Sequence, residues 1–206
     1  MSGMAKFLKV GVAAGTLLLA GCGEGESSLP DISAEESARI AQVGEEATGE
    51  LLRTLVGRLT AAIQEGGPAH AVEFCSTEAI PLTHMVEADL EGGLELKRTS
   101  FRYRNPDNAP DSAEAQALRY FEDHVVEGGE VPSRYVQRVS ETQFRYYQPL
   151  FVGEVCLQCH GARESIAPAV LEKVEAVYSE DLATGYEAGD FRGVVRVTVP
   201  VEILEG

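Results

Sequence analysis

The chain has 206 residues, which is enough for one domain of ordinary size with a hydrophobic core. Its 33 acidic residues against 17 Lys and Arg give a net charge of −16. An acidic surface repels phosphate backbones and anionic lipid headgroups, which argues against a nucleic-acid-binding protein and against direct docking on an anionic membrane. The simpler interpretation of the negative charge is a solvated surface that keeps the protein soluble, and the alternative is that it binds a basic redox partner.

Residues 1–21 are typical of a bacterial lipoprotein signal peptide. Lys6 and Lys9 form a short positive region, and the apolar run over residues 10–20 is too short for a permanent membrane span. Residues 19–22, Leu-Ala-Gly-Cys, resemble the lipobox, in which the signal is cut before a cysteine that is then lipidated. An ordinary signal peptide with a chance cysteine is the alternative. We therefore expect a periplasmic protein that is attached to a membrane only through lipid on Cys22, and the outer membrane is favoured because no aspartate follows that cysteine.

The first half of the chain is predicted to be helical. Residues 22–32 are rich in Gly, Ser and Glu and are expected to form a flexible tether, so that the folded domain covers residues 33–206. Ser33 and Glu36 have the spacing of a capping box. Apolar residues then recur at intervals of three and four, which predicts one long amphipathic helix ended by Gly66-Gly67-Pro68. A second helix is expected over residues 69–88, kinked at Pro81.

The second half is predicted to be rich in strands. We expect strands over residues 94–104, 135–139, 143–152 and 193–201, because these segments are rich in β-branched and aromatic side chains. A helix is expected to begin near Asp111 after a Pro-rich loop, and another covers residues 166–177. Helices followed by strands with inserted helices predict an α+β fold with an antiparallel sheet.

Cys156, Cys159 and His160 form the Cys-x-x-Cys-His motif of a c-type haem attachment site. The two thiols add across the vinyl groups of the porphyrin, and the adjacent histidine ligates the iron. A thioredoxin-like dithiol and a zinc site are the alternatives, but the segment does not resemble a βαβ unit, and zinc requires four ligands. The motif therefore predicts one covalently bound haem c.

The second axial ligand is predicted to lie upstream of the motif, because no His, Met or Cys follows His160. Cys75 falls on the apolar face of the second predicted helix and has no other assigned role, and thiolate ligation of haem iron is chemically well founded. A small buried hydrophobic residue is the ordinary role of such a cysteine. His124 and Met85 remain rival ligands.

Several stretches resemble the single-haem c-type family with a PAS-like fold, which occurs as exported proteins and as the sensing domain of some histidine kinases. The resemblance runs from about residue 44 to residue 200. Its motifs are Ala71–Ser76, Lys97–Ser100, Arg104–Asp111, Tyr147–Leu150, the haem motif, Ala183–Tyr186 and Gly189–Gly193. The chain departs from the family at Ser179, where a proline is usual. The resemblance implies a PAS-like sheet and iron ligation by His160 and Cys75.

Arg98, Arg102 and Arg104 are candidate partners for the haem propionates, since a guanidinium matches a carboxylate through two hydrogen bonds. Fixing the Pro-rich loop that follows is the more ordinary role of this segment. With both axial positions filled, we expect electron transfer with an unknown redox partner. A redox or diatomic-gas sensor that acts through a partner protein is the alternative, because the chain as given carries no output domain. An enzyme such as a peroxidase is not expected, since catalysis requires an open iron position.

Overall fold

A computed structural model of the chain describes residues 29–204. The predicted signal peptide, the lipidation of Cys22 and most of the expected tether lie outside the described residues. No helix within residues 29–204 is both long enough and apolar enough to cross a membrane.

The first helix, α1, runs from Ala34 to Thr77 and is broken at Gly67. Its start is as predicted, because the Ser33 side chain accepts from the Glu36 N–H and the Glu36 side chain accepts from the Ser33 N–H. At Gly67 the backbone has φ 77° and ψ −179°, a conformation that glycine adopts without a Cβ penalty. Pro68 follows directly, and its fixed φ suits the first position of the next helical segment.

The second helix, α2, covers Ala79–Asp89, and the predicted kink at Pro81 is wrong. The chain is interrupted at Glu78, where α1 ends, rather than inside one helix over residues 69–88. Pro81 is consequently in the first turn of α2. The N–H that proline lacks has no helical partner at such a position, so the residue is tolerated there without breaking the helix.

Four strands form one antiparallel sheet in the order β1-β4-β3-β2, and the α+β prediction is confirmed. The strands are β1 Glu95–Thr99, β2 Tyr135–Arg138, β3 Gln143–Phe151 and β4 Phe191–Pro200. The first strand ends five residues before the predicted position. Beyond Thr99 the chain turns away, and the fourth strand approaches so closely that a Cβ on Gly193 would lie 2.3 Å from the Thr99 carbonyl oxygen.

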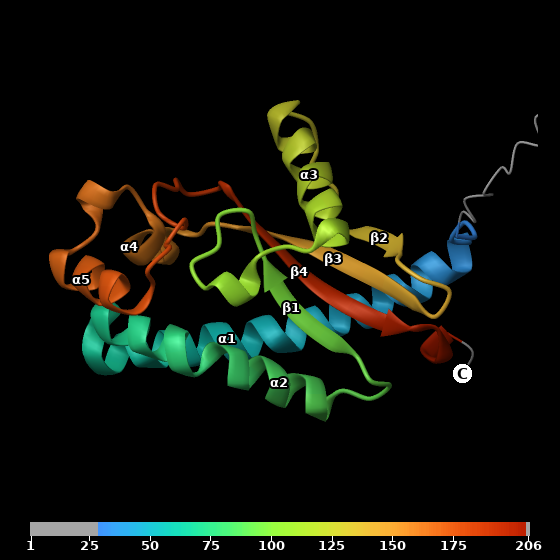
Figure 1. Ribbon diagram of the computed structural model, residues 1–206, viewed down its shortest axis with the longest axis horizontal. Coiled ribbons are helices and arrows are strands. Elements are labelled where there is room, and N and C mark those ends of the chain that lie inside the picture. Colours follow the sequence, from blue (N-terminus) through green and yellow to red (C-terminus); the bar gives the residue numbers. More distant parts are fainter. Residues whose placement is uncertain (1–28, 205–206) are drawn as a thin grey trace, which may run out of the picture.

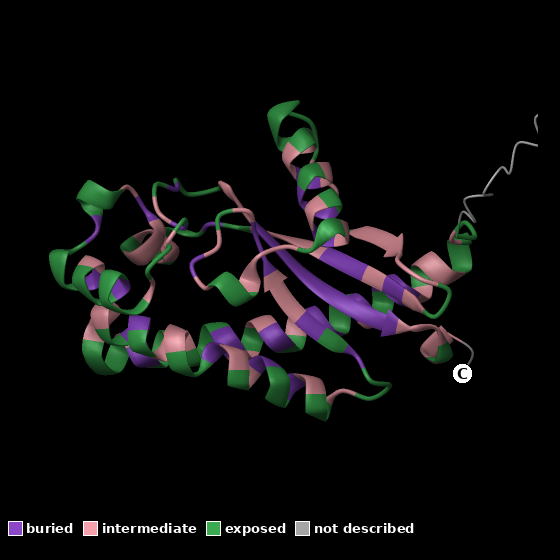
Figure 2. Ribbon diagram, in the orientation of Figure 1, coloured by how far each residue is buried: buried purple, intermediate pink, exposed green. Residues whose placement is uncertain are grey.

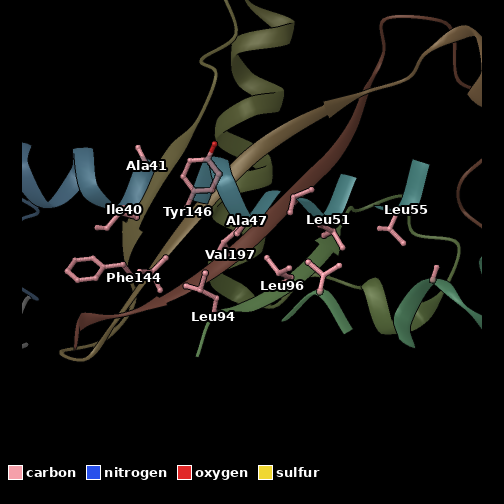
Figure 3. Packing of buried hydrophobic residues seen from close by; sticks show 14 residues of the cluster. Ile40, Ala41, Ala47, Leu51, Leu55, Leu94, Leu96, Phe144, Tyr146 and Val197 are labelled. Atoms are coloured by element: carbon pink, nitrogen blue, oxygen red, sulfur yellow. The ribbon is translucent and has the colours of Figure 1, made fainter. Parts of the chain in front are cut away.

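The main core lies between the sheet and the pair α1 and α2, which cover the same face (Figure 1). Figure 2 shows the buried residues along β3, β4 and the side of α1 that faces them. Side chains of α1 meet side chains of the sheet directly (Figure 3). Gly44 permits one close contact, since a Cβ there would lie 2.2 Å from Cγ of Tyr146. The helix thus packs against an aromatic ring at this point.

The opposite face of the sheet carries α3, Ser112–Val126, which stands out from the sheet in Figure 1. It begins near Asp111 as expected, and Asp111 caps its N-terminus. Glu114 in its first turn is buried, and it accepts hydrogen bonds from Lys97 of β1 at 2.8 Å and Arg196 of β4 at 3.2 Å. A buried carboxylate requires such partners, so this ion-pair network fixes the start of α3 on the sheet.

Short helices gather at the end of the molecule beside the second half of α1 (Figure 1). They are η2 Glu154–Cys156, α4 Leu157–His160, η3 Arg163–Ser165 and α5 Pro168–Val177. The predicted start of α5 at residue 166 lies two residues early. Val170 and Val174 of α5 pack with Val72 of α1, and this contact holds the attachment motif next to the α1 segment that carries Cys75.

Candidate cofactor site

A pocket of about 330 Å³ lies between α1, β1, the end of β3 and α4. Its walls are largely apolar, and they include Leu52, Leu55, Val56, Leu59, Val72, Ile80 and Leu150. Cys75 enters from α1, and Cys156, Cys159 and His160 enter from η2 and α4. The structure therefore brings the Cys-x-x-Cys-His motif into the same cavity as Cys75, which lies 81 residues before Cys156 in the sequence.

The imidazole of His160 is held by the loop that precedes β4. Its Nδ1 lies 2.7 Å from the carbonyl oxygen of Ala183. A carbonyl only accepts hydrogen bonds, so Nδ1 carries the proton, and Nε2 is left with its lone pair free for a metal ion. Burial, with further contributions from Arg104 and Arg192, lowers the pKa of His160 to about 3. The imidazole is consequently neutral at pH 7, which is the form that ligates metals.

Arg104 and Asp181 brace the attachment motif. Arg104 pairs with the Asp181 carboxylate through Nε at 3.0 Å and Nη2 at 3.1 Å, and Nη2 also donates to the Cys159 carbonyl at 2.7 Å. Asp181 in turn accepts from the Ala183 N–H at 2.9 Å. The same loop donates to the His160 carbonyl from the N–H of Tyr186, at 3.0 Å. These bonds connect the residue that holds the imidazole to the backbone of the motif itself.

Cys75 lies half-buried in the last part of α1, between the breaks at Gly67 and Glu78. Burial raises the pKa of its thiol, and the nearby Arg98 and Arg104 act in the opposite direction. Burial also raises the pKa of Cys159, and Arg104 acts in the opposite direction. The three cysteines of the described chain are free. They therefore offer thiol sulfur on two sides of the same cavity.

Three arginines line the pocket, and two of them are among the three predicted propionate partners. Arg98 and Arg104 line it as expected, and Arg192 joins them from the start of strand β4. Arg102 does not, because its guanidinium lies 3.8 Å from the Tyr186 ring centroid and donates to the carbonyls of Leu182 and Thr184. Arg192 lies within the motif at residues 189–193, but the sequence does not indicate that its side chain enters the pocket. No Asp or Glu of residues 29–204 lines this pocket.

The rival ligands lie elsewhere. His124 is on α3, where its Nδ1 lies 2.7 Å from the Tyr120 carbonyl, and Met85 is on α2 with 60% of its surface exposed. Neither contributes to the pocket. No group of three or more His, Cys, Asp or Glu in the described part of the chain could hold a metal ion, so the zinc interpretation gains no support. Cys75 is therefore the candidate that faces the motif.

Comparisons with known proteins agree on one relationship. The family model described as Tll0287-like matches residues 29–200, which is most of the chain. A solved structure described as "Crystal structure of the cyanobacterial heme-protein Tll0287" is similar at a TM-score of 0.55 and 24% sequence identity, covering 82% of this chain and 96% of that one. At that identity the likeness is one of fold. No curated protein matches the chain.

Proposed function

The chain belongs to the Tll0287-like family, and from this membership and the pocket we propose that it binds one haem. The haem is of the c type, joined through thioethers to Cys156 and Cys159. His160 and Cys75 are its axial ligands. The domain that carries it is PAS-like in architecture.

One observation carries this proposal: Cys75, Cys156, Cys159 and His160 come from two distant segments and line one apolar cavity. The volume of about 330 Å³ falls within the range of roughly 300–1,000 Å³ typical of cofactor sites. The walls suit a flat apolar macrocycle, and the neutral imidazole suits iron. Three arginines suit the two negative propionates. The relative described as a heme-protein is consistent with the same cofactor.

Electron transfer is the activity that this ligand set favours. When bound, the haem supplies a one-electron couple, and a soft anionic thiolate stabilises the ferric form and lowers the potential. The protein's own residues hold the ligand geometry. His160 is fixed through Ala183, and Cys75 is supplied by a helix packed on α5. With both axial positions filled, no position is left for a substrate, so we do not propose an enzyme. We further propose an exported lipoprotein of the periplasm, with the outer membrane favoured and an unknown redox partner.

A redox or gas sensor is the second candidate, and one feature favours it. The segment that carries Cys75 is bounded by the non-helical Gly67 and by the interruption at Glu78. A ten-residue helical piece between two breaks can shift relative to α4 more easily than the middle of a continuous helix. Such a shift would release the thiolate and open the iron to a diatomic gas, and a partner protein would read the change.

The test is to produce the chain in a bacterial host that attaches haem c and to measure its mass, its absorption and electron paramagnetic resonance spectra, and its reduction potential. We expect one covalent haem, a low-spin ferric signal with thiolate character and a low potential. Cys75→Ala should abolish the thiolate signature, whereas Met85→Ala and His124→Ala should leave it. Repetition under CO and NO separates the candidates, because ready displacement of the thiolate favours the sensor.

A Cys75→Ala spectrum identical to that of the parent would contradict the ligand assignment, and absence of covalent haem would contradict the function.

A further inference from the structure

The pocket is cationic although the protein is acidic. The chain has 33 acidic residues and 17 Lys and Arg, yet Arg98, Arg104 and Arg192 are the charged residues of residues 29–204 that line the cavity. Like charges gathered in a half-buried site repel one another, and an unpaired buried charge is costly. The lining is thus suited to a ligand that brings negative charge of its own.

Arg104 is already neutralised by the protein. Its guanidinium forms the two-bond pair with Asp181, and both side chains are about nine-tenths buried, with exposed fractions of 9% and 10%. It also donates to the Cys159 carbonyl and contacts the Ala183 carbonyl at 3.4 Å. This arginine serves the attachment segment, and its charge is already balanced by the Asp181 carboxylate.

Arg98 has no such partner. It lies on β1 opposite Val195 of β4, and strand alternation directs it to the same face as the core residue Leu96, toward α1. Within residues 29–204 its guanidinium makes no hydrogen bond and no ion pair. Burial lowers the pKa of Arg98 because it disfavours the charged guanidinium, and its neighbours Cys75 and Tyr178 act in the opposite direction. A guanidinium that lines a cavity and has no anionic partner is available to bind a negatively charged ligand.

Arg192 is similarly uncompensated. Its Nη1 donates to the Arg102 carbonyl at 3.0 Å, and its guanidinium lies 5.3 Å from the Tyr186 ring centroid. No carboxylate of the described chain pairs with it. Burial lowers the pKa of Arg192, Tyr186 acts in the opposite direction, and the repulsion from Arg104 and Arg98 adds to the lowering. The two arginines without a carboxylate partner therefore line the same cavity.

We infer that Arg98 and Arg192 bind the two propionate carboxylates of the haem, while Arg104 holds the attachment segment and Arg102 lies outside the site. This assignment rests on the proposed function. The propionates lie at the edge of the macrocycle opposite the vinyl carbons that cysteines modify. In the protein, the two arginines enter the cavity from β1 and β4, whereas Cys156 and Cys159 enter it from η2 and α4. A guanidinium meets each carboxylate through a charged, bidentate pair.

The test uses the full haem-loaded chain and two measurements, the resonance Raman bending modes of the propionates and the midpoint potential. Arg98→Gln and Arg192→Gln should shift the propionate modes and lower the potential, because removal of a nearby cation favours the more positive ferric iron. Arg98→Lys should restore most of the potential while the modes stay shifted, since lysine keeps the charge but cannot bind in a bidentate way.

Arg163→Gln is the matched control, because Arg163 is exposed, pairs with Glu175 near the attachment motif and does not line the pocket. It should leave both measurements near those of the parent. Wild-type propionate modes in both Arg98→Gln and Arg192→Gln would overturn the inference. If Arg98→Gln fails to load haem, the propionate bending modes of Arg98→Lys and Arg192→Gln test the inference instead. A parent chain without covalent haem would instead overturn the proposed function, and it would do so before any variant is made.

Discussion

Arg104 and Asp181 form a two-bond ion pair, at 3.0 and 3.1 Å, directly behind the motif that carries Cys159 and His160. Both partners are nearly buried, and both also bond to backbone groups of the motif or of the loop beside it. The pair therefore links two segments that are far apart in the sequence. It does so at the point where the imidazole of His160 donates its orienting hydrogen bond to the Ala183 carbonyl.

Arg104→Gln should lower the free energy of unfolding by about 3 kcal/mol, because it leaves the buried Asp181 carboxylate without its counter-charge. Urea unfolding followed by circular dichroism measures the change. Arg163→Gln removes an exposed pair instead and should cost less than about 1 kcal/mol. Equal losses in the two variants would show that the Arg104 pair has no special structural role.

Acid should weaken the cap of α3. Burial tends to raise the pKa of Asp111, but the Glu114 N–H and Arg145 outweigh it, so the pKa is lowered on balance. A carboxyl whose pKa is lower in the folded than in the unfolded state stabilises the fold above the unfolded value of about 4, and this contribution disappears as the pH falls through the folded value.

Asp111→Ala should therefore cost about 1 kcal/mol at pH 7 through loss of the cap and of the Arg145 pair. The difference from the parent should shrink steadily below about pH 4, since the parent then loses the same charge. Urea unfolding at neutral and acid pH measures both values. A difference that stays constant over this range would refute a role for the ionised carboxylate.

Gly193→Ala should destabilise the protein, because the new Cβ would lie 2.3 Å from the Thr99 carbonyl oxygen and the backbone there has φ 142°. We expect a loss of roughly 1–3 kcal/mol from backbone strain, with more from separation of β1 and β4. Gly57→Ala is the matched control in the exposed middle of α1, where nothing lies within 4 Å of the new atom. It should stabilise the protein by about 0.5–1 kcal/mol. Thermal unfolding of both variants measures the contrast.

Haem removal should expose the repulsion among the pocket arginines. A haem-free chain, produced in a host without the attachment machinery, should gain more stability from added salt than the haem-loaded chain, because salt screens like charges. The haem-free double variant Arg98→Gln/Arg192→Gln should lose this extra dependence. Equal salt responses in the haem-free parent and the double variant would contradict the idea that these two cations lack partners.

Helix starts and helix breaks could be predicted from the sequence. The cap at Ser33, the break at Gly67 and the start of α3 near Asp111 all depend on neighbouring residues, and they lie where their patterns indicate. The Pro81 kink failed for a local reason as well, because a proline in the first turn marks a helix start as readily as an interruption. The early end of β1 was not predictable, since it depends on the close approach of Gly193 from a strand nearly a hundred residues later.

The sequence by itself determined the Cys-x-x-Cys-His motif, the set of candidate ligand residues and the α+β class, because spacing and periodicity are properties of short segments. Only the tertiary structure decided which candidates share a cavity. Packing of α5 on α1 brings Cys75 to the motif, whereas His124 is carried away on α3. The pairing of β1 with β4 directs Arg98 into the pocket, Arg192 enters it at the irregular start of β4, and the stacking on Tyr186 keeps Arg102 out. These outcomes depend on contacts between distant segments, which no local pattern specifies.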